Sequence, residues 1–254
     1  MSKLQLSFEI SENFGSVAKI ESGKVTLIDS FFFEDKKDFQ YKDRLAKCLI
    51  DNGLEHLSPD EITVSWIDVH ATLVPMNVFK PELLDDFFSA CFNKKVKHND
   101  IDYNRIFSHS LVNIYEIPLW VKSFFVLRYP RVNIMHIYSH LIKANNQSIT
   151  APPEIHCLIY PESMFLMLSK AGNIIFCNTF EINQMEDILY YLSFTLQKQE
   201  LVFEQSKMTF SIAAKVEFLN SEIFSKEMKQ MSNLKNIKLH FEDHYSFKIQ
   251  EFCV

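Results

Sequence analysis

Residues 155–197 read IHCLIYPESMFLMLSKAGNIIFCNTFEINQMEDILYYLSFTLQ, three apolar segments with short polar breaks between them, followed by a helical pattern. Short connections of this kind predict that the three segments pair as an antiparallel meander. The predicted strands are Ile155–Tyr160, Ser163–Leu168 and Ile174–Phe180, and the predicted helix covers Gln184–Gln199. This order of elements decides the fold, because it occurs a second time in the chain.

The earlier copy begins near Leu4. Strands are predicted at residues 4–10, 15–20 and 24–33, before a helix that Asp38 caps and Asn52-Gly53 ends. In each half of the chain a strand, a helix and another strand follow. The duplication therefore predicts an α/β architecture of two lobes.

The first half is longer than the second. After a strand at residues 61–67, we expect Ala71 to Val74 to extend the same sheet, and Pro81 to open a helix through Cys91. The pattern further predicts a hairpin, a helix and a strand, at residues 104–109 with 112–117, at 118–129 and at 132–137. We interpret the segment around 93–130 as an insertion in the first lobe.

A polar stretch that ends in Pro152-Pro153 divides the two copies, because paired prolines disfavour both helix and central strand. We expect a first lobe at residues 1–145 and a second lobe at 146–254. The last strand, helix and strand of the second lobe are predicted at residues 207–213, 222–231 and 237–239.

Composition excludes several classes of protein. The chain has 254 residues, a hydrophobic content of 47% and 24 phenylalanines, enough for a large core and against disorder. A net charge of -6 argues against a nucleic-acid binder, and the basic run Asn93–His98 is typical of a solvated turn. The sequence shows no signal peptide and no membrane-spanning stretch, so we expect a cytoplasmic protein. Five cysteines without a CxxC pair indicate free thiols.

The helix at residues 184–199 carries more apolar surface than one buried face requires. Asn183 and Glu186 are expected to form its capping box. Tyr190, Tyr191 and Phe194 spread hydrophobicity around the side not used by the main apolar stripe. Such a helix either packs lobe against lobe or presents an aromatic patch to a partner. Asp187, Tyr190, Tyr191 and Phe194 are accordingly our candidate partner-binding residues.

The chain resembles a known family through the helix Asp187-Ile188-Leu189-Tyr190-Tyr191, the preceding strand end Asn178-Thr179-Phe180, and Thr72-Leu73-Val74-Pro75 with Phe79. These motifs resemble the DUF 3822 (domain of unknown function) family of Bacteroidetes over nearly the whole chain. The resemblance implies a two-lobed actin-like ATPase fold, with duplicated ribonuclease-H-like lobes built on mixed sheets. Active members of that superfamily bind ATP between the lobes through Asp-x-Gly hairpins and a Gly-Gly segment.

None of those nucleotide motifs is present. The equivalent hairpins read Phe8–Gly15 and Ile159–Met164, and the segment that the resemblance places near the adenosine, Phe210–Ala214, has no glycine pair. The chain has only 4 glycines, whereas average usage would give roughly eighteen. Pro161 also removes an amide donor from the second hairpin. We therefore expect no nucleotide cofactor.

The remaining polar patterns favour structural roles. The pairs His136/His140 and His240/His244 have the spacing of helical zinc ligands but lack the HExxH motif. His156, Cys157 and Cys177 could meet across strands but lack a fourth ligand, and the acidic pairs Asp85-Asp86 and Glu242-Asp243 are typical of solvated surface. No nucleophile motif occurs. We predict no catalytic residue and no metal site.

These observations favour a non-catalytic cytoplasmic scaffold or adaptor on an actin-like fold that has lost nucleotide chemistry, with a protein partner. Two alternatives stay open. One is a divergent nucleotide-binding protein or ATPase that uses the interlobe cleft; a positively charged cleft would favour it, and a cleft lined by Glu9, Glu12 and Glu162 would oppose it. The other is a cytoplasmic platform of an envelope or secretion assembly.

Overall fold

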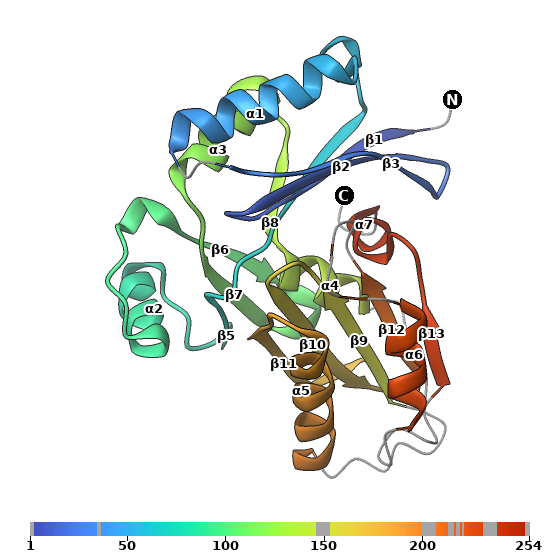
Figure 1. The fold of residues 1–254 in the computed structure, drawn as a ribbon. Coiled ribbons are helices and arrows are strands. Elements are labelled where there is room, and N and C mark those ends of the chain that lie inside the picture. The colour runs from blue at the N-terminus through green and yellow to red at the C-terminus, as the bar shows by residue number, and fades with distance from the viewer. Residues whose placement is uncertain are drawn as a thin grey trace. The chain divides into compact units, whose positions relative to one another are not determined.

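The structure is a computed structural model that describes residues 3–34, 37–145, 153–199, 207–212, 216, 219, 221–230 and 238–251. The chain forms two compact units, residues 1–144 with 247–254 and residues 145–246. Figure 1 shows the ribbon of both units. The predicted segment Ala144–Pro153 is helical at Ala144 and Asn145, and its residues 146–152 lie outside the described residues.

A five-stranded mixed sheet forms the centre of the first unit, in the order β3-β2-β1-β4-β8. The meander pairs antiparallel, whereas β1 pairs parallel with β4, and β4 pairs parallel with β8. Its strands are β1 (Leu4–Ile10), β2 (Phe14–Glu21), β3 (Lys24–Phe32), β4 (Glu61–Trp66) and β8 (Asn133–His136). The predicted meander is confirmed, with its turn glycine Gly23 at positive φ.

Two helices pack on one face of this sheet, α1 (Asp38–Asp51) and α3 (Leu119–Arg128) (Figure 1). Their inward side chains join Leu6, Phe8 and Ile10 of β1 in one buried core. The alternate β1 residues are polar but also buried. Gln5 donates to the hydroxyls of Ser7 and Thr63, and the Thr63 hydroxyl donates to the side-chain oxygen of Gln250. These bonds satisfy polar groups that would be costly to bury alone.

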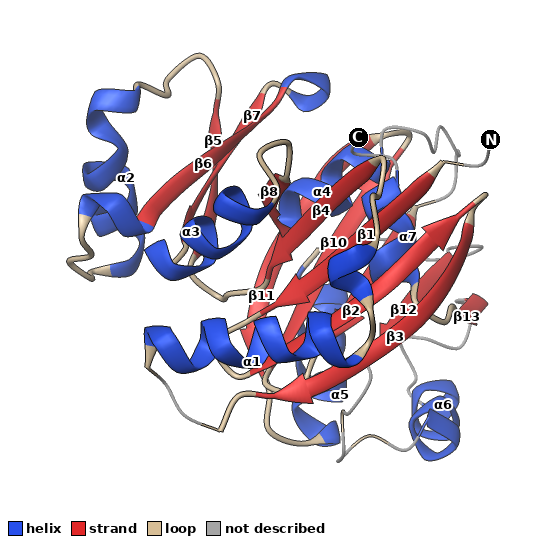
Figure 2. Cartoon of the chain, turned by 90° about the horizontal axis from the view of Figure 1, so that it is seen from above, coloured by secondary structure: helices blue, strands red, loops and turns tan. Residues whose placement is uncertain are grey.

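A separate three-stranded sheet in the order β5-β7-β6 lies in the first unit beside α2 (Leu84–Phe92) (Figure 2). Its strands are β5 (Ala71–Pro75), β6 (Ile101–Ile106) and β7 (Leu111–Glu116). The expectation that Ala71 to Val74 extend the main sheet is wrong, because β5 pairs antiparallel with β7 instead. The expected insertion around 93–130 overlaps this layer up to Glu116, whereas α3 packs in the main core.

The second unit repeats the topology of the first, with a mixed sheet in the order β11-β10-β9-β12-β13. Again a meander pairs antiparallel and two further strands add in parallel. Its elements are β9 (Glu154–Ile159), β10 (Ser163–Lys170), β11 (Asn173–Glu181), α5 (Met185–Lys198), β12 (Lys207–Ile212), α6 (Ser221–Gln230) and β13 (Lys238–Phe241). The predicted strand and helix ends at Ala213, Met231 and Ile237 lie outside the described residues.

Two short helices were not predicted from the sequence. Helix α4 (Ile137–Asn145) follows β8 without a break, and α7 (Tyr245–Glu251) follows β13 after three residues. The last residue of α4 contributes to the second unit, and α7 ends in the first unit. Among the described residues no helix is both long and apolar enough to cross a bilayer.

Candidate functional site

The predicted partner-binding residues all lie on α5 in the second unit. Asp187 is the third residue of the helix and accepts hydrogen bonds from the backbone N–H groups of Asn183 and Gln184, at 2.8 and 3.2 Å. The expected capping box of Asn183 and Glu186 is wrong by one residue, because the helix starts at Met185 and Gln184 occupies the N-cap. Asp187 therefore has a structural role at the helix start.

The three aromatic candidates continue a series of ring contacts that begins on β11. The ring of Phe180 stacks on Tyr191 at a centroid distance of 4.4 Å, and Tyr191 contacts Tyr190 edge to face at 5.3 Å. Tyr190 stacks in turn on Phe194 at 6.0 Å. Tyr190 is 61% exposed and Phe194 45% exposed, whereas Tyr191 is half-buried. We call Phe180, Tyr190, Tyr191 and Phe194 the aromatic surface.

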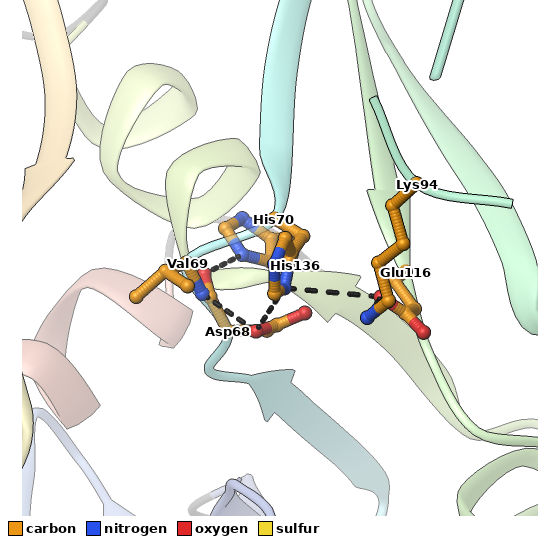
Figure 3. A network of polar contacts seen from close by, with 6 residues as sticks. All are labelled: Asp68, Val69, His70, Lys94, Glu116 and His136. Atoms are coloured by element: carbon orange, nitrogen blue, oxygen red, sulfur yellow. Dashed lines mark hydrogen bonds and ion pairs between the residues drawn. The ribbon is translucent and has the colours of Figure 1, made fainter. Parts of the chain in front are cut away.

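A second cluster of functional side chains lies in the first unit, where the chain leaves β4 for β5 (Figure 3). The Nδ1 atom of His70 lies 3.2 Å from Oδ1 of Asp68 and 3.8 Å from Oε2 of Glu116. One ligand atom from each of the three residues lies within 4.8 Å of the other two. We call Asp68, His70 and Glu116 the carboxylate-histidine cluster; all three side chains are half-buried.

The backbone fixes this cluster from several directions. Oδ1 of Asp68 accepts the N–H of Val69 at 2.7 Å, and the backbone N–H of Glu116 donates to the carbonyl oxygen of His70 at 3.1 Å. The carbonyl oxygen of Asp68 lies 3.0 Å from Nε2 of His136, a fully buried side chain. Nδ1 of His136 accepts the N–H of Tyr138, so Nε2 carries the proton and donates to that carbonyl.

Charged groups surround the carboxylate-histidine cluster and change the pKa of its histidine. Nζ of Lys94 lies 2.6 Å from Oε2 of Glu116 and supplies a positive charge beside two carboxylates. Hydrogen bonding to Asp68 raises the pKa of His70 against the opposing effect of partial burial. Burial lowers the pKa of His136 to about 4, so that imidazole is neutral at pH 7. The cluster can thus hold a cation, either an ammonium group or a metal ion.

Sequence reasoning did not find the carboxylate-histidine cluster. In the sequence Lys94 belongs to the basic run Asn93–His98, which is typical of a solvated turn. In the structure Lys94 pairs with Glu116, and His98 pairs with Asp85 at 2.8 Å. An Asp-x-His motif directly after a strand was the available signal for Asp68 and His70. Glu116 reaches them through the pairing of Ala71 with Tyr115, which no local pattern specifies.

The histidine and cysteine groups that have ligand-like spacing in the sequence do not form a shared site among the described residues. His136 and His140 are fully buried, and His136 belongs to β8 while His140 belongs to α4. His156 and Cys177 both lie opposite Met167, on opposite sides of β10, so that strand separates them. Within the described ranges, the carboxylate-histidine cluster is the one group of three or more possible metal ligands.

The second unit contains a cavity of about 490 Å³ at the end of β12. Phe210, Ile212 and Phe241 form its apolar wall. Three acidic residues also line it, Glu222, Glu242 and Asp243, and no basic residue does among those that the structure describes. The adenosine segment expected from the sequence begins here, but its residues Ala213 and Ala214 lie outside the described residues. A lining of this charge is unfavourable for phosphate.

Comparisons with known proteins agree with this architecture. A chain from Bacteroides thetaiotaomicron, described as a protein with actin-like ATPase fold and unknown function, is similar at 15% identity and a TM-score of 0.78, covering 99% of this chain and 96% of that one. A chain of the PilM-PilN type IV pilus biogenesis complex is similar at 10% identity and a TM-score of 0.50, covering 94% and 90%. A search of curated proteins finds no match.

At these identities the structural neighbours establish the fold alone, which is the two-lobed actin-like ATPase fold with mixed sheets expected from the resemblance. The family model described as "Protein of unknown function (DUF3822)" matches residues 2–247, nearly the whole chain. The protein therefore belongs to the DUF3822 family.

Proposed function

We propose that the protein is a non-catalytic cytoplasmic scaffold or adaptor that binds a protein partner through the aromatic surface. The observation that carries this proposal is the stacked pair Tyr190 and Phe194, which is exposed on α5 although both side chains are large and apolar. Aromatic side chains supply much of the binding energy at protein interfaces, at a small cost in conformational entropy. A partner that inserts an apolar side chain beside these rings would remove them from water.

The two hairpins support the loss of nucleotide chemistry. In the β1–β2 turn the Ser11 hydroxyl accepts the N–H groups of Asn13 and Phe14, at 3.1 and 3.0 Å. In the β9–β10 turn the N–H of Tyr160 bonds to the carbonyl of Ser163, and Pro161 has none. Amides that already have partners inside the turn are not available to a phosphate group.

The glycines of the chain are required for turns and for close packing. Gly23, Gly53 and Gly172 lie at positive φ. At Gly15 an added Cβ would lie 2.7 Å from the ring of Phe31, so this glycine is needed for packing. All 4 glycines of the chain therefore have a role in turns or packing, which leaves none for a phosphate-binding loop.

A cytoplasmic platform of an envelope or secretion assembly is the second candidate, and a specific observation favours it. The neighbour from the type IV pilus biogenesis complex is described together with a protein partner. Cys48 and Cys157 are buried free thiols, as is usual in a reducing compartment. This candidate differs from the first only in the identity of the partner.

Partner capture with a matched control tests the proposal. The double variant Tyr190→Ala/Phe194→Ala should lose a partner that the wild type retains from cell extract. The control Phe39→Ala removes a ring that is 60% exposed on α1 and should retain it. Both variants should change the free energy of unfolding by no more than about 0.5 kcal/mol. Equal capture by all three proteins would contradict the assigned surface.

Thermal stability with and without millimolar Mg-ATP tests the nucleotide alternative. A ligand that binds only the folded state raises the apparent melting temperature. We expect no saturable shift. A clear shift would instead support a divergent nucleotide-binding protein and would contradict the loss of nucleotide chemistry.

A further inference from the structure

The carboxylate-histidine cluster comes close to the spacing of a metal site. Ligand atoms that share a divalent cation at bonds of about 2.0–2.2 Å lie about 3.0–3.6 Å from one another. The two distances from Nδ1 of His70, 3.2 Å to Asp68 and 3.8 Å to Glu116, lie close to that range. All three ligand atoms lie within 4.8 Å of one another, so small side-chain movements would bring them together around one ion.

The donors are also held as a metal site requires. Asp68 is fixed by the N–H of Val69 and, through its own carbonyl, by the buried imidazole of His136. The ring of His70 packs edge to face against Phe92 at a centroid distance of 5.5 Å. Glu116 is tied to His70 through the backbone. Ligands oriented by such outer contacts lose little freedom when a metal binds.

We propose that Asp68, His70 and Glu116 bind a divalent transition-metal ion of the zinc type, and that Lys94 competes with the metal for Glu116. One imidazole and two carboxylates suit zinc and its first-row neighbours. The proposal uses no residue of the aromatic surface and is independent of the proposed function.

Lys94 is the reason that competition is expected. Its ammonium group contacts Glu116, but its side chain is 44% exposed and can move into solvent. Bound metal would take the place of this ammonium group. Asp68 lies in the loop after β4 of the main sheet, and Glu116 is the last residue of β7 in the three-stranded sheet. A bound ion would therefore link this loop to the three-stranded sheet.

Titration of the purified full chain with Co²⁺ and Zn²⁺ tests the site, by absorption for Co²⁺ and by calorimetry for Zn²⁺. We expect one ion per chain with metal absorption bands for Co²⁺. Asp68→Asn, His70→Ala and Glu116→Gln should each weaken binding about tenfold or more. Lys94→Met should strengthen binding several-fold, because it keeps an unbranched side chain of similar length and removes the competing charge.

The matched control is His98→Ala, which removes a histidine that pairs with a single carboxylate in the same unit. Its metal affinity should equal that of the wild type. Lys94→Met changes a side chain near the surface and should fold normally, so it tests the site even if a ligand variant does not fold. Equal affinity of wild type and His70→Ala, or no saturable binding by either wild type or Lys94→Met, would overturn the proposal.

Discussion

Helices α1 and α5 occupy the same place in the two units, after the third strand of the meander. They differ in the burial of their aromatic side chains. On α1 the ring of Tyr41 stacks on Trp120 of α3 at 4.4 Å with an interplanar angle of 2°, and Tyr41 is 4% exposed. On α5 the exposed ring of Tyr190 contacts only rings of its own helix, Tyr191 and Phe194, in the described part of the chain.

A duplicated architecture can therefore bury an aromatic side chain in one unit and expose its counterpart in the other. In the first unit a second helix supplies the partner for an aromatic ring, and the pair becomes part of the core. In the second unit the corresponding helix α6 packs Phe224 against Phe210 and Phe241 of the sheet instead. Rings that contribute to the core in one unit are therefore exposed on the corresponding helix of the other.

Removal of the α3 ring should give the largest effect. Trp120→Ala is expected to lower the free energy of unfolding of the first unit by about 3–5 kcal/mol, because it leaves a cavity beside Tyr41 and Phe33. Phe194→Ala should change it by no more than about 0.5 kcal/mol. Urea unfolding measures both. Trp66 in the same unit reports the transition by fluorescence in the Trp120→Ala variant, since the chain has 2 tryptophans. Similar losses of unfolding free energy in Trp120→Ala and Phe194→Ala would contradict the difference in aromatic packing between the two units.

Acid should produce the next largest effect, through His140, which is fully buried in the first unit. Burial lowers the pKa of His140 to about 3, and the nearby Lys143 and His136 act in the same direction. The unfolded chain, with a histidine pKa near 6.5, takes up the proton first. His140 alone should therefore lower stability as the pH drops below about 6.5, by up to about 1.4 kcal/mol for each pH unit, and His136 should add to this loss.

Urea unfolding followed by tryptophan fluorescence between pH 7 and pH 5 measures this loss. His140→Leu, which replaces the imidazole with an apolar side chain, should make the pH dependence shallower and leave the contribution of buried His136. A histidine NMR titration of the wild type offers a second readout. Protonation of folded His140 above pH 6 would contradict the expected burial effect, whichever way the variant behaves.

The repeated meander could be predicted because its connections are local. Turn residues such as Ser22-Gly23 and Ala171-Gly172 specify antiparallel neighbours within a few positions, and the structure confirms both turns. Strand β5 could not be assigned to its sheet, because the choice between β4 and β7 as neighbour depends on long-range packing. The carboxylate-histidine cluster depends on the same pairing and was missed for the same reason.

The two short helices were missed for other reasons. Helix α4 begins directly after His136, without a Ser, Thr, Asp or Asn at its N-cap and without a polar break, so its apolar residues continued the pattern of the strand. Helix α7 has 7 residues, too few to show a helical period, and Gln250 attaches it to Thr63 far away in sequence. By contrast the aromatic candidates on α5 were visible because their helix is long and periodic.

The smallest expected effects concern how the two compared helices begin. Helix α5 is capped by Asp187, whereas α1 has Lys37 at its N-cap with no side-chain hydrogen bond. Asp187→Ala should therefore lower stability by about 1 kcal/mol, and Lys37→Ser should raise it by about 0.5–1 kcal/mol. Amide hydrogen exchange of the first helical turn localises each change to its own helix. If Asp187→Ala abolished partner capture while leaving the exchange at Asn183 and Gln184 unchanged, Asp187 would contact the partner directly, and its capping role would not explain its place beside the aromatic surface.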